Sequence, residues 1–257
     1  MHKNLEKMMK KVVFLLLLTL VLLPFGEACA QSDSQPSPEI RQLADQAFHF
    51  YSARETDRFL ATVKKIKEAT ESTKYEETYY RICSYEAIYM FEYIDRQQGV
   101  QLAHDIYHNA KAHNSNVGMY FATFTLGTIR EQSGNMGLAE KSFLQALKLK
   151  EKYLPNESAA PCYLGLCETA LHRKDYDEVN EYAHKALDEP GIIPMNQITA
   201  WSYKCLARYN QGDSLGFEEA YMERERLIAK YGGQGGLFGE LINVYQAKNR
   251  KQWQLAL

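Results

Sequence analysis

The segment AHDIYHNA, residues 103–110, places two histidines four residues apart, with an acidic residue directly after the first. On a helix, His104 and His108 share one face, which is the spacing of a two-histidine zinc site. Asp105 is one methylene shorter than the glutamate that activates water in such sites, and the nearby His113 falls in a predicted loop. We therefore predict no metal site and no catalytic residues here, but two solvated histidines on an outer helix face.

Motifs for other chemistries are missing from the sequence. No glycine-rich phosphate loop precedes a predicted helix, and no G-x-S-x-G sequence occurs. We interpret the YGGQGG segment at 231–236 as a flexible break between helices. The chain has 30 basic and 32 acidic residues, a net charge of −2, and lacks the basic stripe that nucleic-acid binding requires. We predict a protein that is not an enzyme, needs no cofactor and binds no nucleic acid.

The first 30 residues have the pattern of an export signal. A basic start precedes the apolar run VVFLLLLTLVLLPF, and Ala28 and Ala30 fit the −3 and −1 positions of a signal-peptidase site. We predict that residues 1–30 are removed and that the mature chain starts at Gln31, is exported to the periplasm and does not insert into the membrane. A lipid anchor at Cys29 is a less favoured alternative, because an acidic residue lies in its lipidation sequence, and an uncleaved anchor is a third.

The rest of the chain has the pattern of an all-α protein. Residues 31–38, QSDSQPSP, are polar and proline-containing, and we predict a disordered leader there. After Glu39, apolar residues recur at intervals of three and four, and no alternating strand pattern of useful length is found. We expect ten or eleven helices in antiparallel pairs and no sheet.

Four cysteines remain in the predicted mature chain. No C-x-x-C pair is present, and two of them lie five residues apart on one predicted helix, which is a poor geometry for a disulfide. We predict free, packed thiols at Cys83, Cys162, Cys167 and Cys205.

A sequence pattern recurs along the predicted helices. Small and aromatic residues in the order A-x3-Y-x2-A occur three times, with spacings of 36 and then 40 residues. The three sets are Ala103, Tyr107 and Ala110; Ala139, Phe143 and Ala146; and Val179, Ala183 and Ala186. Upstream of the second set, Leu126 and Gly127 lie on one predicted helix, and Gly134 and Asn135 form the turn that follows it.

This arrangement resembles the tetratricopeptide repeat, in which L-G on the first helix, a G-D or G-N turn and A…F…A on the second helix recur every 34 residues or slightly more. The resemblance implies a right-handed superhelical solenoid of antiparallel helix pairs. Residues 84–230 would hold repeats starting near residues 84, 120, 160 and 198. Residues 39–83 would form a degenerate N-terminal helix pair, and residues 237–257 a partial C-terminal repeat.

The small residue after the leucine has a physical role in this resemblance. It allows the two helices of a pair to approach closely, and we assign this role to Gly127, Cys167 and Cys205. The first and fourth units depart from the pattern, because Phe91 stands in the place of the small residue and Lys204 in the place of the leucine.

In tetratricopeptide arrays the first helices line the concave side. Counting positions 2, 5, 9 and 12 of each unit predicts an aromatic and acidic groove that binds a protein or peptide partner. Its candidate residues are Phe48, Tyr51, Tyr85, Ile88, Glu92, Phe121, Phe124, Glu131, Leu164, Glu168, Leu206 and Tyr209. The alternative interpretation is that half of the aromatic side chains pack between repeats.

The C-terminal segment INVYQAKNRKQWQLAL suggests a second function. We expect the end of a first helix, a turn at Lys248 and Asn249, and the opening of a second helix, so that the array stops within a pair. Exported arrays with spacings of 36–40 residues resemble the extracytoplasmic repeat region of two-component sensor kinases. The alternative function is therefore the sensor region, as a fragment or truncated form, of a membrane signalling histidine kinase.

Overall fold

The computed structural model describes residues 36–70, 75–231 and 238–256, with side chains as far as Arg250. These residues form eleven α-helices and one π-helical turn, and they contain no strand. The all-α prediction is therefore confirmed. The predicted export signal, most of the leader and most of the glycine-rich break lie outside the described residues.

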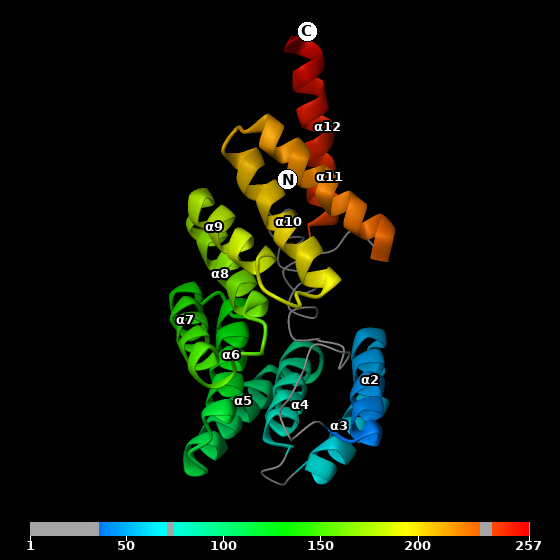
Figure 1. Cartoon of the computed structure of the whole chain (residues 1–257), viewed down its shortest axis with the longest axis vertical. Coiled ribbons are helices and arrows are strands. Elements are labelled where there is room, and N and C mark those ends of the chain that lie inside the picture. The colour runs from blue at the N-terminus through cyan, green and yellow to red at the C-terminus, as the bar shows by residue number, and fades with distance from the viewer. Residues whose placement is uncertain (1–35, 71–74, 232–237, 257) are drawn as a thin grey trace. The chain divides into compact units, whose positions relative to one another are not determined.

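The chain divides into two compact units with a boundary between Glu157 and Ser158. In the N-terminal unit the elements are α2 (Pro38–Ala53), α3 (Thr56–Thr70), α4 (Glu76–Tyr89), η2 (Met90–Ile94), α5 (Arg96–Ala112), α6 (Asn116–Gln132) and α7 (Met136–Tyr153). In the C-terminal unit they are α8 (Ala160–Arg173), α9 (Tyr176–Leu187), α10 (Pro194–Asn210), α11 (Ser214–Tyr231) and α12 (Gly239–Ala256). Within each unit, consecutive helices pack as antiparallel pairs (Figure 1).

Turn residues set the boundaries of these pairs. Gly134 and Gly212 have φ of 79° and 76°, a left-handed conformation that glycine adopts without strain, and they close the α6–α7 and α10–α11 turns. Lys174 has the same conformation, with φ of 62°, at the end of α8. Asp175 then accepts a hydrogen bond from the amide of Glu178 at 3.1 Å and caps α9. Short polar turns therefore explain why the second helix folds back on the first in these three pairs.

The expected end of the leader and the expected starts of the repeats can be located on these helices. Ser37 caps α2 by accepting a hydrogen bond from the amide of Ile40 at 3.3 Å, so the helix begins at Pro38, the last residue of the expected leader. Of the expected unit starts, residue 160 is the first residue of α8, whereas residues 84, 120 and 198 lie inside α4, α6 and α10.

The close contact predicted at Gly127 is present between α6 and α7. A Cβ atom added at Gly127 would lie 2.9 Å from Cε1 of Phe143 and 3.2 Å from Cβ of Ser142. Real Cβ atoms are almost never this close to a ring carbon, so the two helices touch at a distance that only glycine permits. This contact confirms the role assigned to Gly127.

The π-helical turn and α5 build a similar contact with the residue sizes exchanged. Phe91 stands where the sequence pattern predicts a small residue, and its partner on the following helix is Gly99 of α5. A Cβ atom at Gly99 would lie 2.5 Å from the backbone nitrogen of Phe91 and 2.6 Å from its Cα. The departure noted in the sequence is therefore compensated by a glycine eight residues later.

We expect Gly99→Ala to destabilise the N-terminal unit by about 1–3 kcal/mol, because the new methyl group meets backbone atoms that cannot rotate away. In an exposed helix the same substitution stabilises by about 0.5–1 kcal/mol, so the sign of the effect tests the contact. The measurement is urea unfolding followed by far-ultraviolet circular dichroism. A stabilised variant would show that α5 and η2 are not in contact here.

The prediction of a turn at Lys248 and Asn249 is wrong. The helix α12 runs without interruption from Gly239 to Ala256. The Asn249 side chain donates to the backbone carbonyl of Ser214 at 3.3 Å, so it contacts the start of α11 instead of ending its own helix. The turn was inferred from residue type alone, and neither glycine nor proline is present to break the helix.

No helix within the described residues combines the length and apolar character needed to cross a membrane.

Candidate functional site

The structure buries most of the side chains expected to line a concave groove. Phe48 is 44% exposed, and Tyr209 is half-buried, with its ring stacked on Tyr245 of α12 at a centroid distance of 3.7 Å. The other ten are buried: Tyr51, Tyr85, Ile88, Glu92, Phe121, Phe124, Glu131, Leu164, Glu168 and Leu206. For these ten, burial favours the alternative interpretation, in which the side chains pack between helices.

An internal ion pair covers one of these rings. The Arg81 guanidinium lies 4.9 Å from the ring centroid of Phe121 and donates to both carboxylate oxygens of Glu157, at 3.0 and 2.8 Å. Burial acts to lower the pKa of Arg81, but the charges of Glu157 and Glu77 more than offset this and hold that pKa well above its ordinary value. Phe121 therefore packs against this ion pair, which lies where a partner would need to bind.

A second buried cluster joins α2, the π-helical turn after α4, and α6. Glu92, in the π-helical turn, accepts hydrogen bonds from the Tyr51 hydroxyl of α2 at 3.1 Å and from the Gln132 amide of α6 at 2.7 Å. Burial raises the pKa of Glu92 to about 7, and the hydrogen bonds from Gln132 and Tyr51, with the nearby Tyr93 hydroxyl, oppose the shift. We call Tyr51, Glu92, Tyr93 and Gln132 the Glu92 cluster.

The C-terminal unit contains a simpler version of this arrangement. Glu168 of α8 accepts a hydrogen bond from the Tyr203 hydroxyl of α10 at 2.9 Å. Burial raises the pKa of Glu168 to about 6, and the bond from Tyr203 acts in the opposite direction. In both units, therefore, a carboxyl group of one first helix bonds a tyrosine of a neighbouring first helix.

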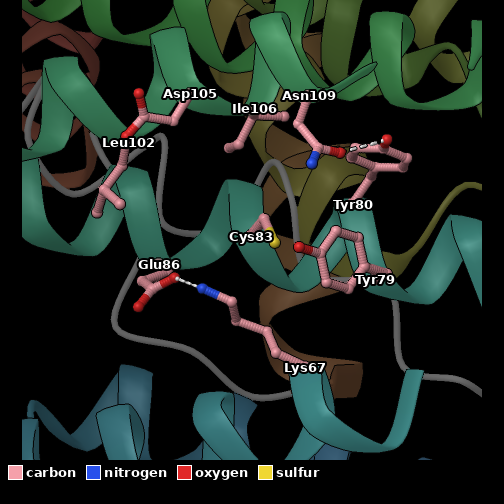
Figure 2. Close-up of a pocket in the computed structure, with 9 residues that line it drawn as sticks. All are labelled: Lys67, Tyr79, Tyr80, Cys83, Glu86, Leu102, Asp105, Ile106 and Asn109. Carbon is pink, nitrogen blue, oxygen red and sulfur yellow. Dashed lines mark hydrogen bonds and ion pairs between the residues drawn. The ribbon is translucent and has the colours of Figure 1, made fainter. Parts of the chain in front are cut away.

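An open cleft lies elsewhere in the N-terminal unit, where α4 forms the floor between α3 and α5 (Figure 2). It consists of two adjoining hollows of about 140 and 480 Å³. The floor comes from Tyr79, Cys83, Glu86 and Met90, which recur along one face of α4 and its π-helical turn over roughly 16 Å. We call this feature the α3–α5 cleft.

Charged and apolar groups alternate in the α3–α5 cleft. The Lys67 ammonium of α3 lies 2.9 Å from the Glu86 carboxylate, and Figure 2 shows this ion pair beside the Cys83 thiol and the Tyr79 hydroxyl. Burial acts to lower the pKa of Lys67, but the hydrogen bond to Glu86 and electrostatic interactions with Glu86, Cys83 and Tyr79 together outweigh it and raise that pKa, so the lysine keeps its charge. Leu102 of α5 is half-buried and lines both hollows.

The Cys83 thiol is not set up for nucleophilic chemistry. Burial raises its pKa to about 12, so it stays protonated at neutral pH, and the thiolate is the reactive form. The prediction of free, packed thiols is confirmed, because Cys83, Cys162, Cys167 and Cys205 are all buried and unbridged.

The histidines of the AHDIYHNA segment lie where the sequence predicted them. His104 and His108 are exposed on α5, whereas Ala103 and Ala110 of the same helix are buried. In the part of the chain that the structure describes, no group of three or more His, Cys, Asp or Glu side chains could hold a metal ion.

Sequence reasoning missed the α3–α5 cleft and the Glu92 cluster. A signal for the cleft was present, because the apolar and aromatic residues of α4 fall on more than one face of the helix, which means that two faces need partners. Repeat counting assigned only one of these faces. The Glu92 cluster had no local signal, since Tyr51 and Gln132 are 41 and 40 residues away from Glu92 in the chain.

Comparisons with known proteins found no matching family model, no matching curated protein and no matching solved structure.

Proposed function

We propose that this chain is a non-catalytic scaffold of the tetratricopeptide type, exported from the cell, that binds a protein or peptide partner. The observation that carries the proposal is the recurring contact between a small residue of a first helix and the second helix of the same pair. Gly127 against Phe143 is the closest instance, and the Cys167 thiol of α8 similarly donates to the carbonyl of Val179 in α9, at 3.6 Å.

Repeated helix pairs of this type build a right-handed superhelical solenoid, an architecture that offers a large surface for its size. The export part of the proposal is supported by the basic start, the apolar run and the Ala28–Ala30 step of the sequence. A scaffold needs neither a cofactor nor an activated nucleophile, in keeping with the raised thiol pKa of Cys83.

We place the partner contact in the α3–α5 cleft. Leu60, Tyr79 and Leu102 are only half-buried there, and they leave apolar surface for the anchor side chains of a peptide. Lys64 on the α3 wall and Asp105 on the α5 wall carry opposite charges. Because Lys64 is already paired with Glu68 of the same wall, at 3.9 Å, this charge pattern favours a peptide segment with a basic residue toward α5.

Selection of displayed peptides against the chain starting at Gln31 would supply a ligand for the test. We expect Leu102→Lys to weaken the selected peptides by about 2 kcal/mol, roughly thirtyfold, because it puts a charge where an apolar anchor packs. The double variant His104→Ala/His108→Ala, on the exposed face of the same helix, is the matched control and should bind as the unmodified chain does. Isothermal calorimetry measures both affinities, and thermal melting verifies that each variant is folded.

Unchanged affinity in Leu102→Lys would reject the cleft. If Phe48→Ala or Tyr209→Ala then abolished binding of the same peptides, the contact would involve the concave groove expected from the sequence. These two candidate groove residues are the ones that are not fully buried. Failure to select any peptide would count against the scaffold itself.

A further inference from the structure

The Glu92 carboxyl group links parts of the N-terminal unit that are otherwise held apart by α4. Its two oxygens bond Tyr51 of α2 and Gln132 of α6, so one side chain connects the first helices on either side of its own helix. It lies in a π-helical turn, in which the amide of Asp95 bonds the carbonyl of Met90 at 2.8 Å. Such wide turns are rare and often occur at functional positions.

We propose that the Glu92 cluster is a proton-operated clamp, which holds α2 against the rest of the N-terminal unit when Glu92 is protonated and releases it when Glu92 is ionised.

The groups that act on the pKa of Glu92 come from α2, from its own π-helical turn and from α6. Tyr51 is supplied by α2, and Arg54 lies at the end of that helix with its guanidinium 5.1 Å from the ring centroid of Tyr93. Tyr93 lies in the same π-helical turn as Glu92, and the α6 contribution, Gln132, is uncharged. Arg54 is exposed, so its charge is screened by water and only partly offsets the cost of a buried carboxylate.

Hydrogen bonding in the cluster suits both protonation states. Ionised Glu92 accepts from Tyr51 and from the amide nitrogen of Gln132. Protonated Glu92 has a hydrogen to donate, and the Oε1 atom of Gln132 is buried without a hydrogen-bond partner. Rotation of the Gln132 amide by half a turn brings that oxygen to Glu92, so the orphan acceptor is used when the proton is bound.

The direction of the effect follows from the proton balance. In the closed clamp the pKa of Glu92 is about 7, and in an opened clamp it returns toward the ordinary value of 4.5. The closed form therefore keeps its proton to higher pH than the opened form does. The stability of the closed form relative to the opened form is greatest at pH values below 4.5, declines as pH rises and levels off above about 7. These two pKa values predict that the opening equilibrium of α2 increases about tenfold between pH 6 and pH 8.5.

Hydrogen exchange of the chain starting at Gln31, read by mass spectrometry, tests the clamp. Protection factors, which correct for the direct effect of pH on exchange, should fall about tenfold in α2 between pH 6 and pH 8.5. Glu92→Gln imitates the protonated group and should remove this pH dependence. Glu168→Gln, which changes the buried carboxyl group of the C-terminal unit, should leave the response of α2 unchanged.

A second variant separates the clamp from simple packing. Tyr51→Phe removes a hydrogen bond that lowers the pKa of Glu92, so the midpoint of the pH response should move to higher pH. A tyrosine that only packs would reduce protection equally at all pH values. The clamp is rejected if α2 shows no pH response, if the response survives Glu92→Gln, or if Tyr51→Phe leaves the midpoint in place.

Discussion

Replacing Arg81 by alanine is expected to lower the free energy of unfolding of the N-terminal unit by about 3–5 kcal/mol. The loss is large because Glu157, whose side chain is only 9% exposed, loses the partner that compensates its buried carboxylate. The same change uncovers the Phe121 ring, on which the guanidinium lies. The measurement is urea unfolding with hydrogen exchange in α4 and α6 as the readout, because these helices report the stability of this unit.

The chain contains its own controls for this experiment. Glu77 also bonds Arg81, at 2.7 Å, but its side chain is 45% exposed, so Glu77→Ala should cost no more than about 1 kcal/mol. Both tryptophans, Trp201 and Trp253, belong to the C-terminal unit, so tryptophan fluorescence reports that unit separately. Equal effects of the Arg81 and Glu77 variants would show that burial of the Glu157 pair does not matter for stability.

Gly127→Leu is expected to destabilise the α6–α7 pair by about 1–3 kcal/mol, because a four-carbon side chain must enter a contact in which a single Cβ atom is already only 2.9 Å from the Phe143 ring. Relief requires either displacement of Phe143, which is fully buried, or separation of the two helices. The change should appear as a lower urea midpoint with the slope unchanged.

Gly137→Leu is the matched control for this substitution. Gly137 is exposed on α7, and nothing lies within 4 Å of a Cβ atom built there. The control should therefore stabilise the helix by about 0.5–1 kcal/mol, through the better helix propensity of leucine. If both variants are stabilised, the helix register assigned to α6 and α7 is wrong.

The repeat contacts could be predicted because they depend on residues close together in the chain. Gly127 and Phe143 are 16 residues apart, within one helix pair, and the short turn between them leaves few ways to pack. The exposed positions of His104 and His108 follow from the same helical periodicity, since Ala103 and Ala110 occupy the buried face.

The proposed cleft and the buried rings of the candidate groove could not be predicted in this way. Repeat counting places Phe121 and Phe124 on one side of α6, but it does not say what covers that side. Phe121 is covered by Arg81, and the ring of Phe124 packs 5.9 Å from that of Phe143. The turn expected at Lys248 and Asn249 failed for a related reason, because Asn249 finds its partner, Ser214, 35 residues away.

The sequence by itself determined the helical class, the pairing of neighbouring helices and the close contact at Gly127, because periodicity, turn residues and small residues act over a few turns of chain. Only the tertiary structure decided which faces stay open and which charges are buried. The bonds of Arg81 to Glu157 and of Glu92 to Tyr51 and Gln132 join residues 40 or more positions apart. Their energies depend on how much water the surrounding helices exclude, and that quantity exists only once the helices have packed.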